Sequence, residues 1–228
     1  MNIREAAVAR AVGVRQATDR PSQRRNADDS GTLSTCRATI HALDVRASKP
    51  AADEDRVTVT GYASVTETPY EMYDMFGPYT EVVSRDAFDA TLKTDPLVEF
   101  TVNHGAGGGM PMAHTRNGSL LLSVDDTGLR YEAQVNPART DVADMLTALR
   151  DGHLAEASFK FRIDAGQWSP DYTEYRINAV DLERGDVSAV NFGANPNATS
   201  GVRSVEQARE PLAPVDVRAA LLSIYLVD

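Results

Sequence analysis

The sequence predicts a mainly β fold, in which an antiparallel sheet or barrel carries a few helices on its outside. About eight short segments rich in β-branched and aromatic residues follow one another, with glycine, proline and aspartate turns between them. Asp125-Asp126-Thr127-Gly128 separates two of these segments, which is typical of a hairpin. No regular alternation of strand and helix runs through the chain, so a doubly wound parallel sheet is not expected.

The expected strands are short runs with alternating or β-branched residues. They are Ala38–Val45, Arg56–Ala63, Tyr79–Val83, Leu97–Val102, Ser119–Val124, Leu129–Val135, Leu154–Ile163, Tyr175–Leu182 and Val187–Phe192. One helix is expected over Arg85–Lys93, with Ser84 as its N-cap. A second is expected to begin at Thr140 or Asp141 and to end near Arg150.

Between the second and third of these strands, Thr66–Pro78 contains prolines, a glycine and three aromatic residues. The prolines and the glycine predict a loop. Its aromatic residues indicate a packed flap or a contact surface.

Composition indicates one domain between two tails. A chain of 228 residues can bury one good core. Residues 1–50 hold nine Lys/Arg and five Asp/Glu of the totals of 23 and 33, which leaves 14 and 28 for residues 51–228. We therefore predict a flexible basic arm at 1–50, with a short helix over Arg4–Val14, and a folded domain at 51–200. Residues 201–228 are a predicted tail, whose apolar Val215–Leu226 favours a terminal helix.

Several classes of protein are not expected. The acidic body argues against nucleic-acid binding, which needs Lys/Arg to neutralise phosphates. No apolar run reaches the length of a membrane span, and the N-terminus lacks the apolar core of a secretory signal. Cys36 is the single cysteine, which excludes an intramolecular disulfide, fits a reducing cytoplasm and indicates an incidental residue. No histidine motif has metal-ligand spacing, so neither a metal nor another cofactor is expected.

Ser158 is the candidate nucleophile. Phe159 and Phe161 alternate with polar residues around it, which predicts a half-buried strand with Ser158 on the face opposite the two phenylalanines. A serine hydroxyl is a poor nucleophile at neutral pH. It needs a base, usually a histidine whose other ring nitrogen is held by a third group.

His104 is the histidine best placed to be that base. It follows a predicted strand and precedes the glycine-rich Gly105–Gly109, which lacks the Lys-Ser/Thr of a P-loop and is interpreted as a flexible loop. Asp186 can supply the third group, although a turn residue before a strand explains it too. Structural or surface roles are expected for the other three histidines, which are His41, His114 and His153.

Six blocks of sequence, between Val57 and about Ala198, resemble in the same order the prohead, or capsid maturation, proteases of tailed bacteriophages. The blocks are Val59–Ala63, Glu81–Phe88, Phe100–His104, Asp126–Ala133, Ala157–Phe161 and Asp186–Ala194. The fifth resembles the pattern M-S-F-G-F, with Lys160 in place of glycine. The second has Asp86 in place of a glycine. Each block is short, but six in order make the resemblance specific.

This resemblance implies a small closed antiparallel β-barrel flanked by helices, as in the herpesvirus assembly proteases. It implies that residues 51–200 are a serine endopeptidase domain that works through an acyl-enzyme. Ser158 is then the nucleophile and His104 the general base. Asp186 is the implied third residue, with Glu183 and Asp181 as alternatives.

The resemblance also implies partners and a location. The substrates would be the major capsid protein with its scaffolding segment, and the chain itself through self-cleavage, with self-association into a homo-oligomer. The location would be the assembling procapsid in the cytoplasm of a bacterial host. Two alternatives without catalysis stay open. One is a capsid-assembly or scaffolding protein in which Ser158 is merely buried, and the other is a module that binds proteins through the aromatic stretch Tyr70–Tyr79.

Overall fold

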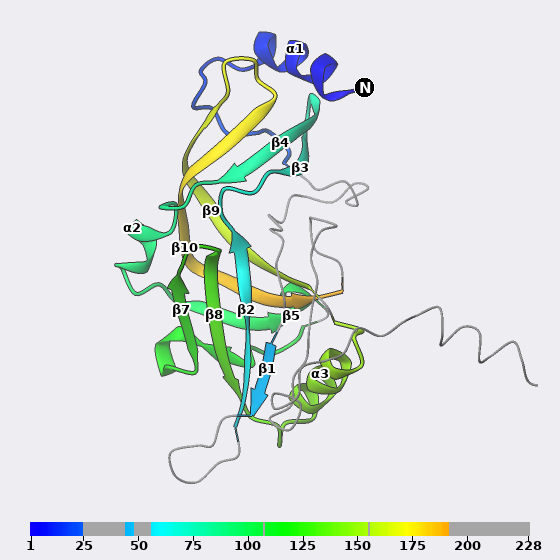
Figure 1. Cartoon of the computed structure of the whole chain (residues 1–228), viewed down its shortest axis with the longest axis vertical. Helices are drawn as coiled ribbons and strands as arrows, with labels where there is room; N and C mark the ends of the chain where they lie inside the picture. Colours follow the sequence, from blue (N-terminus) through cyan, green and yellow to red (C-terminus); the bar gives the residue numbers. More distant parts are fainter. Residues whose placement is uncertain (25–43, 48–55, 107, 155, 192–228) are drawn as a thin grey trace, which may run out of the picture.

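The structure is a computed structural model that describes residues 1–24, 44–47, 56–106, 108–154 and 156–191. Its helices are α1 (Ile3–Gly13), α2 (Asp89–Leu92) and α3 (Thr140–Arg150), with 3-10 turns η1 (Asn103–Gly105) and η2 (Thr115–Asn117). Its strands are β1 (Asp44–Ala47), β2 (Val57–Val65), β3 (Tyr70–Asp74), β4 (Gly77–Val83), β5 (Val98–Val102), β6 (Ala113–His114), β7 (Leu120–Val124), β8 (Gly128–Val135), β9 (Glu156–Trp168) and β10 (Glu174–Val190). Helix α1 lies at one end of an elongated molecule, and β7, β8 and α3 lie toward the other (Figure 1).

The strands form two sheets. The smaller one is antiparallel, in the order β1-β2-β8-β7. The larger one has the order β3-β4-β10-β5-β6, with β9 also paired to β10. The two sheets share one core, in which the ring of Phe100 on β5 lies 5.6 Å from that of Tyr131 on β8.

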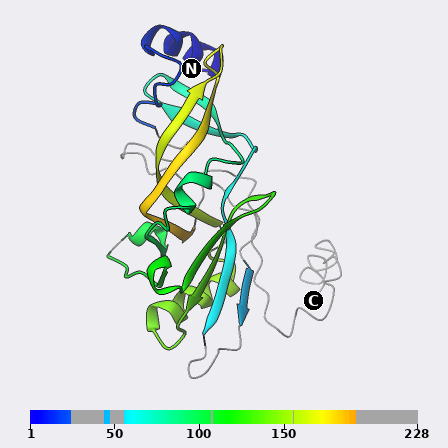
Figure 2. The same cartoon turned by 90° about the vertical axis from the view of Figure 1, so that its left-hand side faces the viewer.

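Strand β10 is the central strand of the larger sheet. Its first part pairs in parallel with β4 and its last part in parallel with β5, while β9 runs antiparallel to it along most of its length. The β9–β10 hairpin therefore runs from the body of the molecule to α1, as both views show (Figure 1 and Figure 2). The part of β10 next to β5 carries the candidate active site.

The closed antiparallel barrel predicted from the resemblance is wrong. Over the described residues the sheets are open, and β10 makes two parallel pairings, so the fold is a mixed α+β arrangement. The physical reason lies in β10. It is one bent strand of 17 residues where the sequence predicted two, and it binds a different neighbour along each half.

Local predictions had mixed outcomes. The hairpin between β7 and β8, the span of α3 and the short N-terminal helix are confirmed. The predicted loop at 66–78 is wrong, because Tyr70–Asp74 and Gly77–Val83 form the β3–β4 hairpin. The helix predicted from Arg85 begins only at Asp89, and Ser84 does not cap it, since its hydroxyl donates to Asn178 instead. Predictions for Cys36, His41 and residues 215–226 lie outside the described residues.

Residues 1–24 pack against the far end of the β9–β10 hairpin. Arg10 on α1 is fully buried, and its guanidinium donates to both oxygens of Asp74, at 2.7 and 2.9 Å. It also donates to the carbonyl of Tyr172 and lies 4.6 Å from the ring centroid of Trp168. A buried arginine with this many acceptors joins α1, β3 and the hairpin into one unit.

Replacing Arg10 with methionine is therefore expected to destabilise the protein by about 3–5 kcal/mol, because Asp74 is left buried without its cation. Urea unfolding followed by circular dichroism measures this loss. The matched control is Arg85→Met, which removes an exposed arginine paired with Asp126 and should leave the midpoint nearly unchanged. Equal midpoints for the two variants would contradict the prediction.

Candidate active site

Two neighbouring strands place four polar side chains on one face of the larger sheet. Ser158 on β9 lies directly opposite Ser188 on β10, and Lys160 lies opposite Asp186. Because side chains alternate between the faces of a strand, residues two apart share a face. Ser158 and Lys160 therefore stand in one row, with Asp186 and Ser188 in the next.

His104 reaches this face from the end of β5. That strand runs parallel to β10 and pairs Thr101 with Ser188. The chain then turns through η1, which brings the imidazole over the β9–β10 rows. Residues 104, 158 and 186 meet because β10 pairs with β5, which is distant in sequence, and with β9, its partner in the hairpin.

The turn that carries His104 has an unusual backbone. Asn103, His104 and Gly105 have φ values of 46°, 58° and 67°, which lie in the left-handed region. This region costs a non-glycine residue about 1–2 kcal/mol, with asparagine and histidine among those that tolerate it best. The turn is held by side chains, since Asn103 accepts from the backbone N–H of Asn191, and Ser188 accepts from that of His104 at 2.8 Å.

The three predicted side chains form a continuous chain of hydrogen bonds. Oδ1 of Asp186 lies 2.7 Å from Nδ1 of His104, and Nε2 of His104 lies 3.0 Å from Oγ of Ser158. An ionised carboxylate can only accept, so Nδ1 carries the proton and Nε2 is free to accept one from Ser158. This is the geometry that a serine nucleophile and its general base require.

All three side chains are shielded from water. Ser158 is fully buried, and the side chains of His104 and Asp186 are 7% and 9% exposed. Electrostatic interactions are stronger in such surroundings than in water. The sequence had predicted a half-buried strand with Ser158 on its outer face, but Ala157, Ser158 and Phe159 are all buried, so both faces of β9 are covered at this point.

A bulge in β10 aims Asp186 at His104. The register between β9 and β10 shifts between Asp181 and Asp186, and Arg184 has a left-handed φ of 59°. Gly185 follows, and a Cβ there would lie 2.2 Å from the carbonyl oxygen of Lys160. Only glycine fits this close approach. The Arg184-Gly185 pair thus explains how the pairing of β10 with β9 resumes with Asp186 opposite Lys160.

The two alternatives to Asp186 are engaged elsewhere. Asp181 binds Arg162, and the backbone N–H of Glu183 together with that guanidinium lowers the pKa of Asp181 below its usual value. Glu183 accepts from the backbone N–H of Leu97 at 2.8 Å. The two nitrogens of the His104 imidazole instead contact Asp186 and Ser158.

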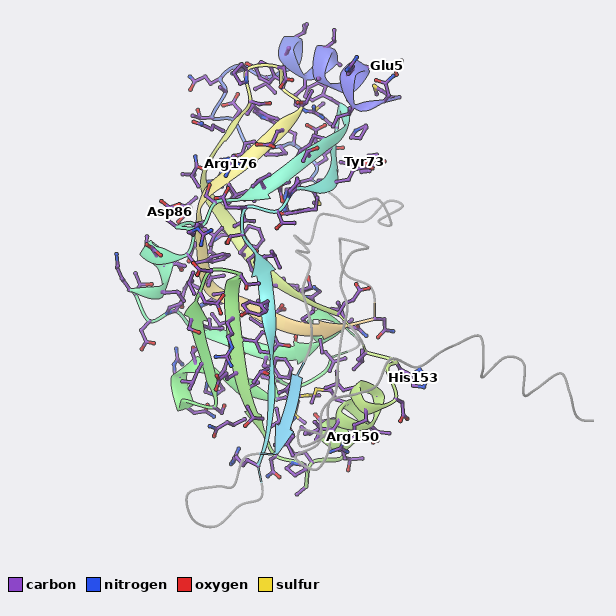
Figure 3. The ribbon with its side chains drawn as sticks, in the orientation of Figure 1. Glu5, Tyr73, Asp86, Arg150, His153 and Arg176 are labelled. Carbon is purple, nitrogen blue, oxygen red and sulfur yellow. The ribbon has the colours of Figure 1, made fainter. Side chains whose placement is uncertain are left out.

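The other described histidines lie in different places. Nδ1 of His114 accepts from the backbone N–H of Asn117, so this ring caps η2. His153 is exposed and follows Arg150, the last residue of α3, and both are labelled near this helix in Figure 3. Within the described ranges no group of three or more His, Cys, Asp or Glu side chains could hold a metal ion, and no helix is long and apolar enough to cross a membrane.

Sequence reasoning missed two residues of this site, Lys160 and Ser188. Both stand two positions from a predicted site residue on the same strand, Lys160 after Ser158 and Ser188 after Asp186. The spacing of two residues, which places side chains on the same face of a strand, was the available signal. It could not identify Lys160 and Ser188 until the pairing of β9 with β10 showed which residues lie opposite each other.

Comparison with known proteins decides the family. A family model described as caudovirus prohead serine protease matches residues 41–211. The chain belongs to this family. It is therefore a serine protease, and its role lies in the maturation of a phage capsid. Comparisons with curated proteins and with solved structures found no match.

Membership confirms the resemblance inferred from the six sequence blocks, all of which lie within the matched range. Because the family is one of serine proteases, it also argues against the two alternatives without catalysis, the capsid-assembly protein and the protein-binding module.

Proposed function

We propose that Ser158, His104 and Asp186 are the catalytic triad with which this prohead protease cleaves peptide bonds. The observation that carries the proposal is the pair of contacts on the imidazole, with Ser158 Oγ at 3.0 Å from one nitrogen and Asp186 Oδ1 at 2.7 Å from the other. Asp186 is preferred to Glu183 and Asp181 because it alone makes the second contact.

The proposed reaction is acyl transfer in two halves. Ser158 Oγ attacks the carbonyl carbon of a peptide bond while Nε2 of His104 takes the hydroxyl proton. The tetrahedral intermediate collapses, the C–N bond breaks, and the imidazolium gives its proton to the departing amine. Water then attacks the ester on Ser158 with His104 again as base, which releases the acid and restores the hydroxyl. Asp186 holds the imidazole in the required tautomer and stabilises its cationic form.

The proposed substrates are the major capsid protein with its scaffolding segment, and the chain itself through self-cleavage within a homo-oligomer. Family membership supports a capsid or scaffold protein as substrate. We place the reaction inside the procapsid, in the cytoplasm of the bacterial host. We also propose a basic N-terminal part at 1–50, whose first 24 residues pack on the folded body, a protease domain at 51–200 and a tail at 201–228, with self-cleavage in the two terminal parts.

Co-expression with the capsid gene from the same genome tests the substrate. We expect the capsid protein to be shortened at one position by the wild-type chain and to keep its full length with Ser158→Ala. Mass spectrometry of the capsid protein, and of the protease itself, gives the cleavage positions. A Ser123→Ala variant is a matched control, because Ser123 is an exposed serine on β7 in the other sheet. Equal shortening with Ser158→Ala would show that the cleavage does not depend on Ser158 and would overturn the proposed triad.

A further inference from the structure

Lys160 occupies a position between the base and the acid of the proposed triad. Its Nζ lies 3.2 Å from Oδ2 of Asp186 and donates to the backbone carbonyl of His104 at 2.9 Å. Oδ1 of the same carboxylate is the atom that holds the imidazole. Lys160 therefore fixes the oxygen of Asp186 that His104 does not use.

Lys160 and Ser188 together hold both backbone polar groups of His104. The N–H donates to Ser188 Oγ and the C=O accepts from Lys160 Nζ. His104 lies in the left-handed region with φ 58° and ψ 33°, a conformation that persists only where surrounding contacts enforce it. The two side chains come from the adjacent strands β9 and β10. These two contacts on the backbone of His104, here called the clamp, are therefore held in place by the pairing of the strands.

We infer that Lys160 is a positioning residue of the active site, which sets the orientation of His104 and Asp186 for catalysis by Ser158. This inference rests on the proposed function and adds a residue to it. Lys160 stands where the family pattern quoted above has a glycine. A glycine cannot make these contacts, so the clamp belongs to this chain's own sequence.

The charge of Lys160 and the contacts that it makes have opposite effects on the rate at which Ser158 attacks. A cation beside Asp186 partly offsets the attraction of that carboxylate for the imidazolium formed during the reaction. On charge alone, removal of Lys160 would speed the attack by Ser158. Loss of the contacts has the opposite effect, because without Lys160 the carboxylate of Asp186 can rotate and the carbonyl of His104 loses its donor. We expect geometry to prevail, because a displacement of about 1 Å can cost a factor of about 100 in rate.

The rate at which a fluorophosphonate labels Ser158 measures the activation of the nucleophile without a known substrate. In the full-length chain we expect Lys160→Met to lower the limiting labelling rate about 10- to 100-fold, with the half-saturating probe concentration changed less than about threefold. Lys160→Arg keeps a cation with several donors and should recover most of the rate. Lys93→Met makes the same chemical change at an exposed position and should label like the wild type.

A double-mutant comparison separates positioning from a general structural effect. Because both contacts of Lys160 act through His104, Lys160→Met should have little further effect on the labelling rate in a His104→Ala background. Labelling of Lys160→Met at or above the wild-type rate would overturn the inference, as would two fully multiplicative effects. Failure of the proposed function looks different. In that case the wild type is not labelled at Ser158, or Ser158→Ala is labelled equally well.

Discussion

Ser158→Ala and His104→Ala are each expected to lower kcat/KM for the cleavage of purified capsid protein by about 10⁴- to 10⁶-fold. Alanine at 158 removes the oxygen that forms the ester. Alanine at 104 removes the group that takes the proton at 3.0 Å, so the hydroxyl remains a poor nucleophile. The measurement is the initial rate of appearance of the shortened capsid chain.

The double variant gives the sharper result. Because the two residues act in one step, Ser158→Ala/His104→Ala should be no slower than Ser158→Ala alone. His114→Ala is the matched histidine control, since His114 only caps η2, and it should keep nearly the full rate. If the two losses multiplied, or if either single variant kept more than about a tenth of the rate, the pair would not be nucleophile and base.

Candidate site residues could be chosen from the sequence more readily than the fold could be predicted, and the reason lies in what each depends on. Local sequence makes Ser158, His104 and Asp186 candidates, namely a serine in an apolar strand, a histidine at the end of a strand and a carboxylate before a strand, and the six blocks that resemble the family select them. The barrel depended on which strands pair. Pairing is set by contacts between distant segments, such as the parallel registers of β10 with β4 and β5, and local patterns do not specify these.

The bulge in β10 shows the same limit at a smaller scale. The sequence predicted two strands, Tyr175–Leu182 and Val187–Phe192, because the apolar pattern is interrupted between them. In the structure the strand continues through Arg184 and Gly185, which are held by backbone bonds and close packing against β5 and β9. The interruption was visible in the sequence. Its function, which is to aim Asp186, required the neighbouring strands.

The choice among the three carboxylates gives the second large effect. Asp186→Asn is expected to lower kcat/KM for capsid cleavage by about 10³- to 10⁴-fold, with the fold intact. The new amide can donate to Nδ1 of His104, which moves the imidazole proton to Nε2. That nitrogen then faces Ser158 as a donor and cannot accept the hydroxyl proton. Circular dichroism and urea unfolding check that the variant is folded.

Asp181→Asn and Glu183→Gln are the matched controls for this prediction. Each makes the same carboxylate-to-amide change within five residues of Asp186, and each side chain is engaged outside the site, by Arg162 and by the backbone of Leu97 respectively. Both variants should therefore cleave capsid protein within about threefold of the wild-type rate. A loss confined to Glu183→Gln or Asp181→Asn would move the third position of the triad to that residue. A loss confined to Asp186→Asn would identify Asp186 as the residue that orients His104, because its carboxylate is the one that contacts Nδ1 of the imidazole.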